Sequence, residues 1–151
     1  MSSKHLRYII GTITLIVLVY LLYPRPLVEN TETSHIKSFL YNPCYGQNVD
    51  SDMVNLYISP ENEKEILTCL RRYKEQKSLA KANECQASRT IAFEILLEDV
   101  GQSKWITIGN PSYSYESYGK LKCRIVDGDS LQGDLMDLLD VSPLKSKLYL
   151  E

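Results

Sequence analysis

The residues able to do chemistry in this 151-residue sequence are few, and their spacing matches no common catalytic site. A Ser/His/Asp or Cys/His site needs a base, a nucleophile and an orienting group that converge. The sequence has two histidines. His5 precedes a long apolar run, and His35 has no nucleophile placed near it. We therefore interpret His35 as a surface residue and predict no catalytic residue of this kind.

Carboxylates are more numerous, and two groups of them are candidates for acid/base pairs. Glu94 and Glu98 lie on the outward face of one predicted strand, and five aspartates surround the last predicted helix: Asp127, Asp129, Asp134, Asp137 and Asp140. A glycosidase needs two carboxyl groups about 5–10 Å apart in a cleft. The spacing indicates no cleft, so solvated acidic faces explain both groups.

Metal and cofactor motifs are also lacking in the sequence. Asp127-Gly128-Asp129-Ser130 faintly resembles a calcium loop, but the later ligands and the bidentate glutamate of such loops are missing. No glycine-rich phosphate loop occurs, and the cysteines have no C-x-x-C spacing. The sequence therefore predicts neither a metal site nor a cofactor.

An aromatic stripe is the feature that best fits recognition. Tyr113, Tyr115 and Tyr118 share one predicted strand, next to Trp105 on the preceding strand. If these rings point outward, they form a rigid surface for a peptide or a sugar, because Tyr and Trp offer large contact area at low entropic cost. Ordinary cross-strand packing is the alternative interpretation.

The four cysteines suit an oxidising compartment. Outside the cytosol, Cys44, Cys69, Cys85 and Cys123 can pair in three ways. Cys69 and Cys123 both point inward from predicted elements, whereas Cys44 and Cys85 both lie in connectors. We therefore expect bridges 69–123 and 44–85, each worth roughly 2–4 kcal/mol. Reduced, partly buried thiols are the alternative.

The compartment depends on residues 8–23, YIIGTITLIVLVYLLY, a run of sixteen residues without a charge. As a helix this run is about 24 Å long, and flanking Lys, Arg and Tyr side chains can extend it toward a bilayer core of about 30 Å. No small-residue cleavage site follows it, as a cleaved signal peptide would require. We predict an uncleaved transmembrane anchor in contact with the lipid bilayer; a cleaved signal or a buried core helix are the alternatives.

The basic flanks predict the orientation. Lys4 and Arg7 precede the run, which favours a cytoplasmic N-terminus over residues 1–7 and an extracytoplasmic remainder, although Arg25 opposes this bias. An inverted topology, with a cytosolic domain and free thiols, is the competing interpretation. Without Lys4, Arg7 and Arg25 the chain has 14 basic and 19 acidic side chains. This negative balance argues against a nucleic-acid partner.

The remaining elements describe one domain. Residues 24–34 contain two prolines and are expected to form a polar stalk before an α+β domain over residues 35–151. We expect strands at 35–41 and 53–58, and a helix capped by Ser59-Pro60 with an apolar stripe at Ile66, Cys69, Leu70 and Tyr73. A polar connector over 77–88 follows.

Four short strands are then expected near 91–98, 104–109, 113–118 and 121–126. A last helix near 129–139, with a capping box at Asp129 and Gln132, ends the domain. The order β-β-α-β-β-β-β-α predicts an antiparallel sheet with both helices on one face.

The layout over about 100 residues, from SPENEKEILTCLRRYK to the end of YSYESYGKLKCRIVDGDSLQGDLMDLL, resembles small membrane-anchored or lipoprotein extracytoplasmic domains of unknown function from Gram-positive bacteria. These families have no assigned activity, so the resemblance implies no catalytic residue. We expect a non-enzymatic binding domain for an envelope protein, a peptide or a toxin that it neutralises. An envelope enzyme with a carboxylate-based site is the alternative.

Overall fold

A computed structural model describes residues 3–46, 52–81, 90–117 and 120–141, and it forms three helices and one antiparallel sheet of eight strands. The helices are α1 (Ser3–Leu22), α2 (Pro60–Arg72) and α3 (Gly128–Leu138). The first four strands are β1 (Arg25–Pro26), β2 (Ser34–Tyr41), β3 (Val54–Asn55) and β4 (Lys74–Lys81). The others are β5 (Ile91–Asp99), β6 (Gln102–Gly109), β7 (Tyr113–Tyr115) and β8 (Leu121–Ile125). The predicted α+β class is confirmed.

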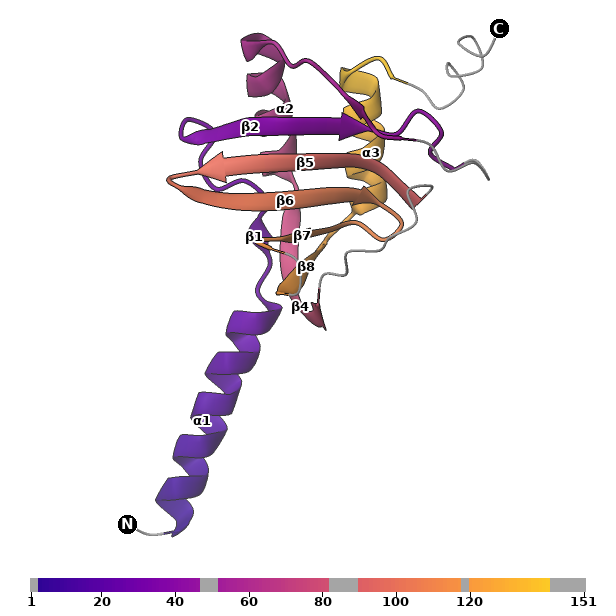
Figure 1. Ribbon diagram of the computed structural model, residues 1–151. Coiled ribbons are helices and arrows are strands. Elements are labelled where there is room, and N and C mark those ends of the chain that lie inside the picture. The colour runs from indigo at the N-terminus through magenta and orange to yellow at the C-terminus, as the bar shows by residue number, and fades with distance from the viewer. Residues whose placement is uncertain (1–2, 47–51, 82–89, 118–119, 142–151) are drawn as a thin grey trace, which may run out of the picture.

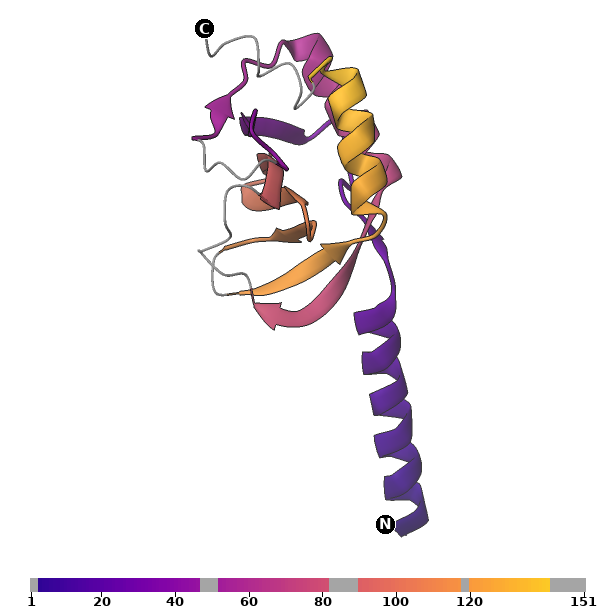
Figure 2. The same cartoon turned by 90° about the vertical axis from the view of Figure 1, so that its right-hand side faces the viewer.

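The sheet has the strand order β1-β4-β8-β7-β6-β5-β2-β3 and is curled. Helices α2 and α3 lie side by side on its inner face, while α1 projects away from the domain (Figures 1 and 2). The core fills the space between these two helices and the sheet. Its fully buried members include Ile66, Leu70, Leu131 and Leu135 from the helices and Phe93, Ile95, Ile106 and Ile108 from the central strands.

Helix α2 forms as its sequence predicts. The Ser59 hydroxyl accepts a hydrogen bond from the Asn62 backbone N–H at 3.2 Å, and Pro60 occupies the first helical position. Acidic residues lie in the first turn and Arg71 and Arg72 in the last, where they complement the helix dipole.

The β5–β6 hairpin also follows the prediction. Val100 and Gly101 have φ angles of 45° and 77°, the left-handed pair that a tight two-residue hairpin turn requires. The Val100 side chain is 84% exposed at this tip.

The expected stalk over 24–34 is wrong in its first half. Arg25 and Pro26 pair with Glu75 and Lys74 of β4, and the next two residues, Leu27 and Val28, are 1% and 3% exposed in the core. Helix α1 therefore leads into the sheet within three residues, because Leu27 and Val28 bury apolar surface that a free stalk would leave in water.

Three further expectations need correction. Strand 53–58 is reduced to β3, whose two residues are exposed. The connector expected from residue 77 begins as part of β4, which pairs with β8. Helix α3 is capped by Asp127 in a left-handed conformation with no side-chain cap bond, so the expected capping box at Asp129 does not form.

Candidate functional site

A cleft of about 1140 Å³ lies between the end of α1 and the uncovered part of the inner face. Its walls come from the last turn of α1, the β5–β6 hairpin tip and strands β4, β7 and β8. Helices α2 and α3 cover the other part of that face, so this is the region where the sheet lacks a helical layer (Figure 2).

Strand register brings polar side chains into this cleft. Ser114 of β7 pairs with Cys123 of β8, which in turn pairs with Lys77 of β4. Directly paired residues of an antiparallel sheet project from the same face, so these three side chains share the inner face. Lys104 joins them because it lies two residues before the inward Ile106 of β6.

A partly buried ion pair crosses the cleft wall. The Lys104 Nζ lies 2.6 Å from Glu75 Oε2, with the two side chains 28% and 13% exposed. Lys104 also donates to the Leu27 carbonyl at 2.9 Å, and the Ser114 hydroxyl donates to the same Glu75 oxygen at 2.5 Å. The Glu75 oxygen therefore has two donors, which satisfy a carboxylate placed away from bulk water.

Cys123 supplies the thiol of the cleft. Burial raises the pKa of its thiol, the Glu75 carboxylate raises this pKa further, and Lys104, Lys77 and Arg25 oppose the rise. Because the net shift is upward, the thiolate that a nucleophilic reaction needs is disfavoured at neutral pH.

The last turn of α1 is held against the cleft by two cations. Lys77 Nζ lies 4.1 Å from the centre of the Tyr20 ring and donates to its hydroxyl at 3.1 Å, and Arg25 lies 4.7 Å from the same ring. Gln76 Nε2 donates to the Leu22 carbonyl at 3.0 Å. These contacts fix the end of α1 to β4 and make the helix part of the site.

The predicted aromatic surface is not an exposed ladder. Tyr113 and Tyr115 are 4% and 3% exposed, their ring centres are 5.6 Å apart, and half-buried Trp105 packs against them. Lys122 covers the Tyr113 ring at 4.6 Å. Cross-strand packing explains these three residues, because their rings cover one another, and Tyr118 lies outside the described residues.

The expected Cys69–Cys123 bridge is absent, since both cysteines are free, as is Cys44. Cys69 lies on α2, where it accepts a hydrogen bond from Arg72 at 3.4 Å, whereas Cys123 faces the cleft. The predicted Cys69–Cys123 bridge was wrong because the two side chains, although both directed inward, lie in different regions: Cys69 in the core on α2 and Cys123 in the cleft. The partner expected for Cys44, Cys85, lies outside the described residues.

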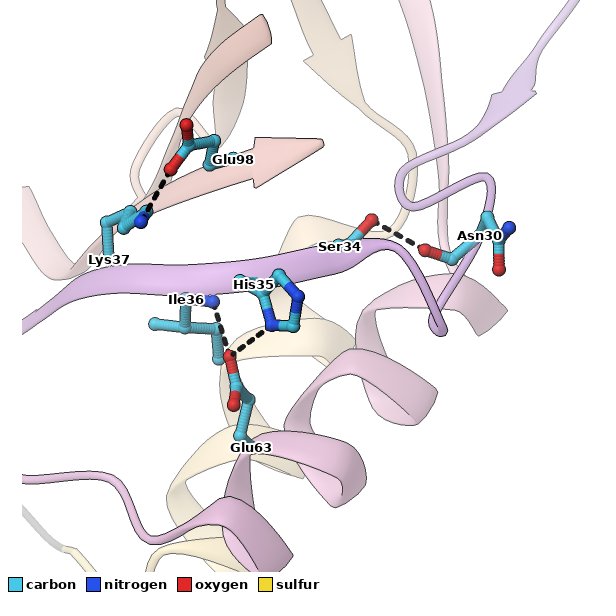
Figure 3. A network of polar contacts seen from close by, with 7 residues as sticks. All are labelled: Asn30, Ser34, His35, Ile36, Lys37, Glu63 and Glu98. Carbon is cyan, nitrogen blue, oxygen red and sulfur yellow. Dashed lines mark hydrogen bonds and ion pairs between the residues drawn. The ribbon is translucent and has the colours of Figure 1, made fainter. Parts of the chain in front are cut away.

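The histidine predicted to be a surface residue takes part in an edge contact. Glu63 of α2 accepts a hydrogen bond from the Ile36 backbone N–H of β2 at 2.6 Å, and its same oxygen lies 3.8 Å from His35 Nδ1 (Figure 3). The His35 side chain is 66% exposed. The contact occupies an N–H on the outer edge of β2 and so discourages pairing with another chain.

Three of the other carboxylates, Glu94, Glu98 and Asp134, have separate partners. Glu98 pairs with Lys37 at 2.7 Å on the sheet (Figure 3), and Glu94 accepts from the Tyr115 hydroxyl at 3.3 Å. Asp134 accepts from both Arg72 and Tyr73 between α2 and α3. Within the described ranges no three His, Cys, Asp or Glu side chains converge as metal ligands.

The sequence interpretation missed Glu75, Lys104 and Ser114 as site residues. A signal was present for Lys104, because the alternation that places Ile106 and Ile108 inward also places residue 104 inward. No such signal marked Glu75, since its strand lacks an apolar period.

Comparisons with protein-family models, with curated proteins and with solved structures find no match to this chain, so its resemblance to Gram-positive extracytoplasmic domains stays a prediction.

Proposed function

We propose that this chain is a single-pass membrane protein whose domain is a non-enzymatic binding module held at the bilayer surface by α1. The observation that carries the proposal is the helix itself. Over Lys4–Leu22 it is long and apolar enough to cross a membrane, and none of it is buried against the domain. At 20 residues it is about 30 Å long, the thickness of a bilayer core.

The junction between α1 and the sheet supports a binding site close to the lipid. A core helix would bury its apolar side chains, yet Ile13, Leu15 and Ile16 are 56%, 62% and 62% exposed. Water is a poor solvent for such a surface. Because only Tyr23 and Pro24 separate α1 from β1, the domain lies beside the bilayer and its cleft opens next to the head groups.

The binding role, in preference to an enzymatic one, rests on the state of the cleft. Its partly buried carboxylate is already paired with Lys104 and Ser114, and its thiol has a raised pKa. Proton transfer or nucleophilic attack would need these groups unpaired and reactive. We therefore propose that a ligand binds in the cleft. The sequence analysis predicts that this ligand is an envelope protein, a peptide or a toxin.

Alkaline carbonate extraction of membranes tests the insertion. The native chain should stay in the membrane pellet, whereas Ile13→Lys with Ile16→Lys should move it to the supernatant, because each charge at the helix centre costs about 3 kcal/mol. Val54→Lys with Tyr57→Lys, at positions 48% and 91% exposed on the domain, is the matched control and should stay in the pellet. A native chain released by carbonate would refute the proposal.

A membrane-impermeant thiol reagent tests the orientation. With a cytoplasmic N-terminus, Cys44 and Cys123 should react in intact cells. Reaction only after lysis would instead support the inverted topology.

A further inference from the structure

The cleft beside α1 adjoins a second, apolar groove on the helix. This groove, about 440 Å³, is lined by Leu15, Ile16, Val19, Tyr20, Tyr23 and Arg25. Tyr20 and Arg25 line both spaces, so the helix groove and the cleft meet at these two residues. One molecule can therefore occupy both, with an apolar part along α1 and a polar part in the cleft.

We propose that these joined spaces bind one anionic phospholipid from the surrounding bilayer, with an acyl chain along α1 and the phosphate beside Arg25, Lys77 and Lys104. This inference rests on the proposed insertion of α1, because only an inserted helix brings lipid to the groove.

The charges at the junction fit an anionic head group. Around Cys123 three cations, Arg25, Lys77 and Lys104, face a single carboxylate, Glu75. Lys104 is paired with Glu75, but neither Arg25 nor Lys77 forms an ion pair with a carboxylate among the described residues. Over its whole lining the cleft is nearly balanced, with five cations and four carboxylates. The excess positive charge is thus concentrated where the two spaces meet.

The apolar surface distinguishes a lipid from a soluble anion. Val100 and Leu121 line the cleft and are 84% and 56% exposed, and the groove on α1 is lined mainly by aliphatic and aromatic side chains. A free phosphate would contact the cations and leave all of this surface uncovered. An acyl chain and glycerol backbone cover it and bury apolar area, which favours the amphiphile.

The proposed position of α1 in the bilayer brings phospholipid next to the site. Leu18, Leu21 and Leu22, in the last turns of α1, form part of the cleft wall. In an inserted helix of this length these residues lie at the head-group boundary, where Arg and Lys side chains extend toward lipid phosphates. A phospholipid therefore reaches the site by lateral diffusion from the adjacent leaflet.

Native mass spectrometry of the full chain in a neutral detergent tests the inference. Phosphatidylglycerol should give a one-to-one adduct at concentrations where phosphatidylcholine gives little. Lys77→Gln should lower retention of phosphatidylglycerol about fivefold, the effect of one basic residue near a lipid surface. Lys77 is exposed, so this change leaves the core intact.

Lys37→Gln is the matched control. It removes the charge of another exposed lysine, on β2 and outside the lining of both spaces, and should leave retention unchanged. In the same micelles, phosphatidylglycerol should slow the alkylation of Cys123 several-fold and leave the alkylation rate of Cys44 unchanged. Peptide mass spectrometry measures both rates.

Three results would overturn the inference: equal retention of the two lipids, equal retention by the Lys77→Gln and Lys37→Gln variants, or unchanged Cys123 alkylation. Full competition by glycerol phosphate would identify a soluble phosphate site instead and also overturn it. A chain that stays in the carbonate-washed membrane but fails these tests refutes the lipid site alone. Release by carbonate refutes the membrane anchor itself.

Discussion

The two parts of the sheet's inner face are filled in different ways. Under α2 and α3, which we call the helix-covered half, Ile66, Leu70, Leu131 and Leu135 close on the central strands with no exposed surface. Beside α1, which we call the cleft half, strands β4 and β8 carry charged and polar side chains around an open space. The same sheet thus provides a packed core and a site.

This difference predicts that one half sets the stability of the domain and that the other half carries the proposed ligand site. Close packing in the helix-covered half gives the domain its free energy of folding and leaves no room for a ligand. The cleft half has a paired carboxylate, two cations without a paired carboxylate among the described residues, and a wall formed by the last turns of α1. A change in one half should therefore affect stability, and a change in the other should affect binding.

The largest expected effect tests the helix-covered half. Phe93 is fully buried. Its ring centre lies 5.6 Å from that of Phe39 and 5.3 Å from that of Tyr41. Phe93→Ala should lower the free energy of unfolding by about 3–5 kcal/mol, because it leaves a cavity among these rings. Urea unfolding of the full chain in neutral detergent, followed by circular dichroism, measures this loss.

Leu121→Ala is the matched change in the cleft half. Because Leu121 is 56% exposed, unfolding should shift by no more than about 0.5 kcal/mol. If Phe93→Ala does not fold, Phe93→Leu should still cost more than Leu121→Ala. Equal costs in the two halves would contradict the comparison.

The next effect concerns the ion pair on the border of the two halves. Lys104→Met should lower stability by about 1–3 kcal/mol, less than a fully buried pair, because Glu75 keeps the Ser114 hydrogen bond and some solvent contact. A double-mutant cycle with Glu75→Gln measures the coupling between the two side chains. Additive single-variant effects would show that the pair contributes nothing beyond packing.

The helix-covered half was largely predictable from sequence. Its residues recur with the period of a helix or a strand, as at Ile66 and Leu70 or Ile106 and Ile108, because each must reach the same core. The cap of α2 and the β5–β6 turn were predictable for a local reason, since Ser59 and Gly101 satisfy backbone geometry on their own.

The cleft half was not predictable, for the opposite reason. Strand β4 places Glu75 and Lys77 on the inner face, so it lacks the apolar alternation that reveals a strand. Strand β1 has only two residues, and it is recognised as a strand only because it pairs with β4. Likewise, a period of two placed Tyr113 and Tyr115 on one face but could not show that the face is covered.

A pH experiment extends the comparison to the contact between α2 and α3. The Tyr73 hydroxyl donates to Asp134 at 2.8 Å, and burial together with this bond raises the pKa of Tyr73 from 10.0 to about 12. Since the folded-state pKa lies above the unfolded one, the stabilisation is complete below pH 10 and is lost as the pH rises through about 12.

Tyr73→Phe should therefore cost about 1 kcal/mol at pH 8, from the lost hydrogen bond, and less at pH 11. Unfolding curves of both chains at the two pH values measure this convergence. Tyr57→Phe, at a 91% exposed position, is the control and should not alter stability at pH 8. A constant difference between the Tyr73→Phe and native chains at both pH values would contradict the assigned bond.

The most direct comparison places one substitution in each half. Cys69 is 2% exposed beneath α3, whereas Cys123 is half-buried in the polar cleft. Cys69→Ser should cost about 1–2 kcal/mol, because removing the hydroxyl from water at this buried position outweighs the hydrogen bond that Arg72 donates there. Cys123→Ser should cost no more than about 0.5 kcal/mol, since Ser114 and Lys77 already make its surroundings polar. If Cys123→Ser were the more costly of the two, the cleft half would be a packed core, and the division between a stabilising half and a binding half would fail.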